Sequence, residues 1–184
     1  MAFAQRKDQH DSLALPAVGK YFEQFGYSVH SFGIELSPDM HEKLKCLHNG
    51  TSKMLRYRPD LIAIHPEKGS LLLEVKSVNS NSSNFAVELD AWEAARIWCR
   101  SGATVLYVFV DIPKNILLCC FPDKLEPQKI FVPRKEDLPR IMKAYKTATI
   151  IYKSNVNGSG TAFFLVPKNT LESLETVLTN WQKP

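Results

Sequence analysis

Two carboxylates and one amine, those of Asp60, Glu74 and Lys76, stand in one short stretch of the sequence. Mg²⁺ prefers oxygen ligands and keeps several of its waters, so one or two carboxylates and a carbonyl suffice to bind it. We therefore expect Asp60, Glu74 and the carbonyl oxygen of Val75 to hold Mg²⁺. Lys76 would then orient or deprotonate a metal-bound water for attack on a phosphodiester.

The surrounding residues predict that these side chains meet on a β-hairpin. Residues 61–64 and 71–73 are apolar, strand-like runs, and the Pro-Glu-Lys-Gly segment between them favours a turn. Because side chains alternate between the faces of a strand, Glu74 and Lys76 should point the same way. Antiparallel pairing would bring Asp60 to them from the other strand. The alternative is a surface hairpin on which Glu74 and Lys76 form an ordinary ion pair.

Pro59-Asp60, followed by Glu74-Val75-Lys76 and then by an amphipathic segment, resembles the PD-(D/E)XK nuclease superfamily, also called restriction-endonuclease-like. The resemblance implies metal-dependent cleavage of DNA, with Mg²⁺ as cofactor and Mn²⁺ as a substitute. It implies an α/β fold whose core has the order α-β-β-β-α-β, with helices flanking a mixed sheet. The short chain looks most like the Holliday-junction resolvases, which typically act as homodimers. A restriction-type, repair or viral processing nuclease is the alternative.

Glu88 is a further candidate for the site. Residues 85–100 predict an amphipathic helix, and Glu88 falls in the middle of its apolar face with Trp92 and Ala95. A carboxylate there is costly unless it is paired or binds a metal. Relatives of the resembled family often place a polar residue at this point, which implies a catalytic role beside Lys76. The alternative is that Glu88 reaches solvent in the first turn and favours the helix dipole.

An additional acid is expected from the first helix, which begins near Asp11 and ends at Gly26. Asp11 falls on the apolar stripe of this helix and so points inward. Because the first helix of the resembled family often supplies an acid, Asp11 is a candidate metal ligand. The alternative is that Asp11 caps the helix. Glu23, on the flank of the stripe, and Glu35, at the end of a predicted strand, are weaker candidates.

A basic segment precedes the predicted hairpin. Residues 38–48 predict a short helix, and residues 49–52 predict a flexible tip. We expect the basic side chains of this region to contact DNA phosphates, and these are Lys43, Lys45, Lys53, Arg56 and Arg58. The alternative is an ordinary solvated face.

Length and composition fit one globular domain. The 184 residues are enough for one sizeable core and too few for two ordinary domains. A net charge of +4 permits a nucleic-acid partner without requiring one. The adjacent Cys119 and Cys120 lie in an apolar run, which favours buried, reduced thiols and a cytoplasmic location. We expect no membrane partner, since no apolar run approaches the ~20 residues of a span, and no signal peptide.

We expect one nuclease-like domain over residues 1–184, with its core at about residues 11–111 and an accessory C-terminal layer at about 112–184. Residues 103–110 predict a buried, central strand. The C-terminal layer carries no motif that we can assign. Its patterns predict strands, a helix, a hairpin and a capped last helix, at residues 116–121 and 130–132, 135–146, 148–166, and from 169 onward.

The sequence therefore predicts a metal-dependent DNA endonuclease, with branched DNA such as a Holliday junction as one expected substrate. One alternative is a catalytically silent nucleic-acid-binding or assembly subunit that keeps the nuclease fold. Another is a protein that binds other proteins and has no nucleic-acid role. Salt-sensitive DNA binding would be absent from that last class. Location in the nucleoid, or inside a host cell for a viral protein, is compatible with the first two.

Overall fold

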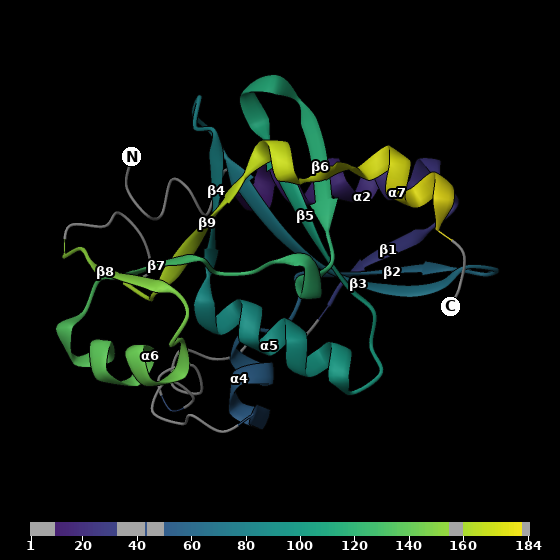
Figure 1. Ribbon diagram of the computed structural model, residues 1–184. Helices are drawn as coiled ribbons and strands as arrows, with labels where there is room; N and C mark the ends of the chain where they lie inside the picture. The colour runs from purple at the N-terminus through teal and green to yellow at the C-terminus, as the bar shows by residue number, and fades with distance from the viewer. Residues whose placement is uncertain (1–9, 33–42, 44–49, 155–159, 182–184) are drawn as a thin grey trace.

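The computed structural model describes residues 10–32, 43, 50–154 and 160–181. Two β-sheets and the helices around them form the molecule (Figure 1). The six-stranded sheet has the order β1-β2-β3-β5-β6-β10. Its strands are β1 (Ser28–Ser31), β2 (Leu61–His65), β3 (Gly69–Val78), β5 (Val105–Asp111), β6 (Ile116–Cys120) and β10 (Glu172–Ser173).

The predicted hairpin and the predicted core order are both confirmed. β2 and β3 pair antiparallel from Leu61 opposite Leu73 to His65 opposite Gly69. The first helix, α2 (Leu15–Gln24), precedes β1, β2 and β3, and α5 (Leu89–Arg100) leads into β5, which pairs parallel with β3. A parallel neighbour on one side and an antiparallel neighbour on the other make this a mixed sheet. All seven residues of β5 are buried, as predicted for a central strand.

Each face of the six-stranded sheet packs on its own apolar core. On one face lie α2 and α7 (Leu174–Asn180), and buried side chains of β3 such as Leu73 and Val75 point toward them. On the other face lie α5 and the second sheet, and Leu72 and Val78 of β3 point there. Alternation along β3 therefore divides its side chains between two buried layers.

The second sheet has four strands in the order β4-β9-β7-β8. These strands are β4 (Asn84–Glu88), β9 (Phe163–Pro167), β7 (Lys129–Val132) and β8 (Thr149–Tyr152). β4 lies between β3 and α5 in the chain, and the other three strands come from the C-terminal third. A short helix, α6 (Leu138–Ala144), connects β7 to β8.

The prediction that a helix begins at residue 85 is wrong. Residues Asn84–Glu88 form β4, which pairs antiparallel with β9, and α5 begins only at Leu89. Within β4, Phe85 and Val87 are buried while Ala86 is exposed, a period of two that five residues do not distinguish from one helical turn. Pairing with a strand from the far end of the chain decides the outcome.

Two predictions for the C-terminal third are also wrong. β8 and β9 do not form a hairpin, because β7 lies between them and pairs with both. The last helix begins at Leu174, where the Ser173 side chain accepts the Thr176 N–H, and not at the capping box expected from residue 169. In both places the turn residues do end the preceding element. The strands on either side, however, pair with segments that lie far away in the sequence.

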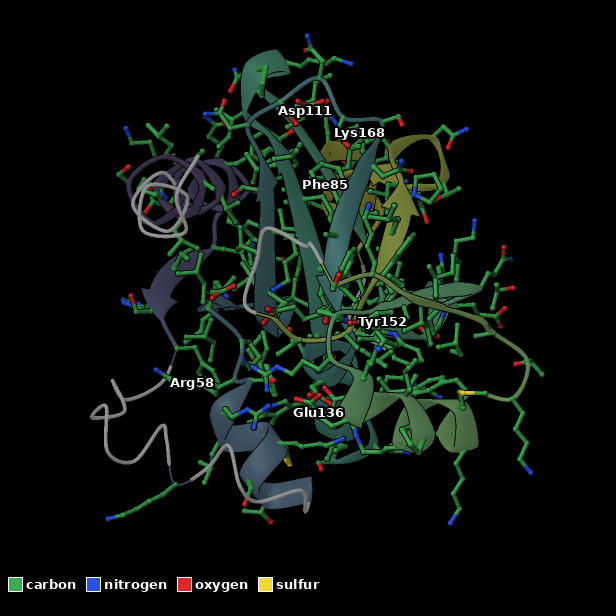
Figure 2. All side chains as sticks on the ribbon, turned by 90° about the vertical axis from the view of Figure 1, so that its left-hand side faces the viewer. Arg58, Phe85, Asp111, Glu136, Tyr152 and Lys168 are labelled. Atoms are coloured by element: carbon green, nitrogen blue, oxygen red, sulfur yellow. The ribbon has the colours of Figure 1, made fainter. Side chains whose placement is uncertain are left out.

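A buried ion pair joins the end of β5 to the segment after β9. Lys168 Nζ lies 2.5 Å from Asp111 Oδ2. It also lies 5.2 Å from the centre of the Phe85 ring on β4, and Figure 2 shows the three residues grouped at one end of the molecule. The pair therefore links the second sheet to the first.

No helix within the described ranges is both long and apolar enough to cross a membrane.

Candidate active site

Asp60 stands directly before β2 and is fixed by its own backbone. Its N–H donates to the Leu73 carbonyl at 2.9 Å, and its carbonyl accepts the Phe32 N–H at 2.9 Å. Its side-chain Oδ2 accepts the N–H of Val75 at 2.7 Å. The carboxylate therefore lies at the edge of β3, next to the backbone of the residue that separates Glu74 from Lys76.

Glu74 and Lys76 point to the same face of β3, as the alternation predicts. Lys76 Nζ lies 2.7 Å from Glu74 Oε1. The surface hairpin considered as the alternative does not describe this pair, because Glu74 is only 7% exposed. The two side chains face the layer between the sheets, where α5 and β4 cover them.

The charges around Lys76 are unbalanced. Burial raises the pKa of Glu74 to about 8, and the carboxylates of Asp60 and Glu88 add to the rise while Lys76 opposes it. Burial alone would lower the pKa of Lys76, but Glu74, Glu88 and Asp60 together raise it above its ordinary value. Three acidic residues thus act on the single ammonium of Lys76. A raised pKa keeps Lys76 protonated in the metal-free protein, which favours orienting a water over deprotonating it.

Glu88 reaches this cluster by a different route from the one predicted. It is the last residue of β4 and stands at the N-cap position of α5 with an extended backbone. Its side chain is half-buried, and its Oε1 accepts a 3.3 Å hydrogen bond from Thr161 Oγ1. Its charge acts on both Glu74 and Lys76. The structure therefore brings Glu88 near Asp60, Glu74 and Lys76, although Glu88 ends a strand and does not lie inside the predicted helix.

Tyr107 also lies near Glu74, and the sequence analysis did not identify it as a site residue. It lies on β5 directly beside Glu74 in the parallel register. The side chain is fully buried, and burial and the nearby Glu74 raise the pKa of its hydroxyl well above the ordinary value. That hydroxyl finds no hydrogen-bond partner in the described part of the chain. A tyrosine in an otherwise apolar strand was the available signal, but the parallel pairing that places it cannot be read locally.

The residues present fit a hard divalent cation. Asp60 and Glu74 offer carboxylate oxygens beside the Val75 carbonyl, and the orphaned Tyr107 hydroxyl has a spare donor for a water or ligand. Across residues 10–32, 43, 50–154 and 160–181, no three His, Cys, Asp or Glu side chains gather closely enough to hold a metal unaided. Mg²⁺ keeps several waters, so two carboxylates and a carbonyl match its requirements.

The three candidates for an additional acid are placed unequally. Asp11 lies in a short π-helical segment, η1 (His10–Ala14), which contacts β3, while its side chain lies outside the described part. Glu23 is exposed on α2. Glu35 lies outside the described residues. Asp11 therefore belongs to a segment that contacts the strand carrying Glu74 and Lys76.

The basic segment is used partly to hold the fold together. Residues 50–52, predicted as a flexible tip, instead begin the helix α4 (Gly50–Arg56), which packs on α5. Lys53 pairs with Glu93 and lies 3.6 Å from Asp90, and Arg56 also lies 3.6 Å from Asp90. Their side chains are only 16% and 13% exposed. Acidic side chains of α5 therefore already compensate two of the five cations expected to contact DNA.

The other three basic residues remain predictions as DNA contacts. Lys43 is exposed, and Lys45 lies outside the described residues. Arg58 is half-buried just after α4 (Figure 2).

The raised pKa of Glu74 predicts a pH-dependent stability. Its folded-state pKa of about 8 exceeds the ordinary 4.5, so the protonated form is favoured by folding. That contribution is complete below the unfolded pKa and is lost as the pH rises through about 8. In EDTA, the free energy of unfolding of the wild type relative to Glu74→Gln should fall with rising pH over this window, with a limiting slope of about 1.4 kcal/mol per unit. Urea denaturation at several pH values measures it, and parallel curves would contradict it.

Comparisons with known proteins give similarity at the level of three-dimensional structure. No protein-family model matches the sequence, and none of the curated proteins matches it. One similar structure is the Holliday junction resolvase Hjc of the archaeal hyperthermophile Archaeoglobus fulgidus, with a TM-score of 0.48, 14% identity, and coverage of 88% of this chain and 93% of that one. Another is D212, a nuclease from a fusselovirus, with a TM-score of 0.47, 12% identity, and coverage of 92% and 88%. By its own element order and strand pairing, the chain has a mixed α/β fold with a restriction-endonuclease-like core.

Proposed function

We propose that this protein is a metal-dependent endonuclease that hydrolyses phosphodiester bonds in DNA. The observation that carries the proposal is the buried pair of Glu74 and Lys76, 2.7 Å apart, on which the charges of Asp60 and Glu88 also act. An excess of buried negative charge is costly unless a cation compensates it. The group therefore suits a site that takes up a divalent metal.

Asp60, Glu74 and the Val75 carbonyl would hold Mg²⁺, or Mn²⁺ in its place. The metal supplies a Lewis acid and lowers the pKa of water in the site. Lys76, kept protonated by its carboxylate neighbours, donates hydrogen bonds that orient a water or a phosphate oxygen. Glu88 adds a negative charge that favours the protonated form of Lys76.

We also propose a class of substrate and an oligomeric state. The short chain, with a bare core followed by small additions, resembles the Holliday-junction resolvases, which supports branched DNA as a substrate and a homodimer as the acting form. A chain acting on cellular or viral DNA would work in the cytoplasm, at the nucleoid or inside a host cell.

Cleavage of a panel of DNA structures tests the proposal. Linear duplex, single-stranded, flapped and four-way DNAs are incubated with the purified protein in Mg²⁺, in Mn²⁺ and in EDTA. We expect cleavage of at least one of them in either metal and none in EDTA, with Asp60→Asn as the inactive control. Salt-sensitive DNA binding without cleavage would instead identify the catalytically silent subunit.

Glu88→Gln should weaken cleavage much more than folding. The amide keeps the size of the side chain and an acceptor for Thr161, but removes a charge that acts on Lys76 and Glu74. Residues that support a metal site in this way typically change activity by about 10- to 100-fold. Initial rates and urea denaturation are compared with those of Glu67→Gln, an exposed residue of the β2–β3 turn. A wild-type rate for Glu88→Gln would remove Glu88 from the site.

A further inference from the structure

The second sheet carries apolar side chains on the face that points away from the core it shares with the first sheet. Alternate residues of its strands, such as Phe164 of β9, pack inward on the core shared with the first sheet. The residues between them point outward, and these include Phe163 and Leu165 of β9 and Phe131 of β7. Phe131 and Phe163 lie opposite each other in the ladder, with stacked rings whose centres are 5.2 Å apart. Leu165 is 43% exposed. Phe131 and Phe163 are half-buried, so both rings stay partly accessible beside Leu165. Apolar groups that gather on an accessible face mark an interaction site.

A pocket opens on this face. Its volume is about 540 Å³, which lies within the range of sites that take small ligand groups. Phe131 and Leu165 line it together with Pro167, and polar groups of Asn84 and Gln128 reach its rim. The lining is therefore mixed, with apolar side chains for the face of a planar ring and polar side chains for its edge.

The charges around the face are mostly positive. Lys129 and Lys124 line the pocket, against one acid, Glu126. Lys124 also forms an exposed ion pair with Glu172, with 3.1 Å between Nζ and Oε1. Lys153 Nζ lies 6.0 Å from the centre of the Phe131 ring. Cations beside stacked aromatic rings complement a ligand that carries both planar groups and anions.

The face leads to the candidate active site. In the ladder between β4 and β9, Glu88 lies opposite Phe163, Ala86 opposite Leu165, and Asn84 opposite Pro167. One end of the outer face is therefore next to Glu88, whose charge acts on Glu74 and Lys76. From Phe163 to Pro167 the strand extends about 13 Å at ~3.3 Å per residue, so a strand bound along β9 would reach from the pocket to the site.

We propose that the outer face of the second sheet binds an unpaired DNA strand. Bases stack on Phe131 and Phe163, one base enters the pocket beside Leu165, and Lys129 and Lys153 contact the phosphates. Stacking on sheet aromatics and a basic track are the two features by which proteins bind single strands. The proposal rests on the proposed function in naming the substrate, a DNA with an unpaired segment next to the bond that is cut, but the binding itself can be measured without cleavage.

Fluorescence anisotropy with a labelled single strand of about 12 nucleotides, a length within known site sizes, tests the binding in EDTA. Phe131→Leu and Phe163→Leu should each weaken the affinity at least about fivefold, because the loss of one base–aromatic stack has an effect of that order. Phe163→Tyr keeps the stack and should retain the affinity. Lys129→Ala should lower the slope of log K against log salt by about 0.7, the value for one phosphate contact on a single strand.

Matched controls come from the opposite face of the first sheet. Phe25 forms a similar aromatic pair with Tyr21 at the end of α2, with centres 5.5 Å apart, and Lys20 is exposed on the same helix. Phe25→Leu and Lys20→Ala should leave single-strand binding unchanged. Thermal melting confirms that each variant folds. If Phe131→Leu does not fold, Phe163→Tyr against Phe163→Leu and Lys129→Ala against Lys20→Ala still decide the question.

Unchanged affinity in both leucine variants would overturn the inference, and so would competition by polyglutamate as strong as that by DNA. Either result would leave metal-dependent cleavage, and its loss in Asp60→Asn, untouched. Conversely, single-strand binding that depends on Phe131 and Phe163, in a protein that cuts no DNA, would support this inference while the proposed function fails.

Discussion

Glu74→Gln and Asp60→Asn should each lower metal-dependent DNA cleavage at least roughly a thousandfold while the protein stays folded. Each amide removes one of the two carboxylates proposed to hold the metal, and the loss of several kcal/mol of charge stabilisation corresponds to such a factor. Initial rates at saturating Mg²⁺ measure the effect. Calorimetric titration with Mn²⁺ shows whether metal binding is lost with it. A wild-type rate in either variant would show that the metal site is elsewhere.

The choice of amides matters because the two carboxylates have different structural duties. Asp60 Oδ2 accepts the buried N–H of Val75 at 2.7 Å, and Asp60→Asn keeps an oxygen there. Asp60→Ala leaves that N–H unpaired, which should cost about 1–3 kcal/mol of stability in addition to activity. Glu74→Gln resembles the protonated form that burial favours, so its free energy of unfolding in EDTA should equal or exceed that of the wild type.

Lys76→Ala should retain metal and DNA binding while losing about 10²–10⁴ in the rate of the chemical step. The ammonium is 2.7 Å from Glu74 and is kept protonated by three carboxylates. It is therefore placed to donate hydrogen bonds at the site of reaction and not to bind the metal. Single-turnover rates and DNA affinity are measured separately, with the exposed Lys114→Ala as control. An equal loss of affinity and rate would make Lys76 a phosphate contact instead.

Lys76→Arg distinguishes two ways in which Lys76 can act. Arginine keeps the positive charge and its donors but does not lose a proton in proteins. Partial recovery of the rate relative to Lys76→Ala would support the orienting role that the raised pKa of Lys76 favours. A rate as low as that of Lys76→Ala, in a folded variant with unchanged metal binding, would support proton transfer by the lysine.

The sequence by itself determined the hairpin and the grouping of its polar residues. Asp60 directly precedes β2, and Glu74 and Lys76 lie in β3, which a tight turn joins to β2. Their relation therefore depends only on the period-two alternation and on antiparallel pairing, both of which are set by near neighbours along the chain. The buried strand β5 was likewise readable, because an unbroken apolar run is required wherever both faces of a sheet are covered.

Only the tertiary structure decided what surrounds that group. Residues 84–88 carry a pattern compatible with a helix or a strand, and they form β4 because β9, far along the chain, pairs with them. Glu88 and Tyr107 reach Glu74 through such nonlocal contacts. The ion pairs of Lys53 and Arg56 with α5 are nonlocal as well. The pairing of strands depends on how much apolar surface the whole chain buries. The local periodicity of the sequence does not carry that information.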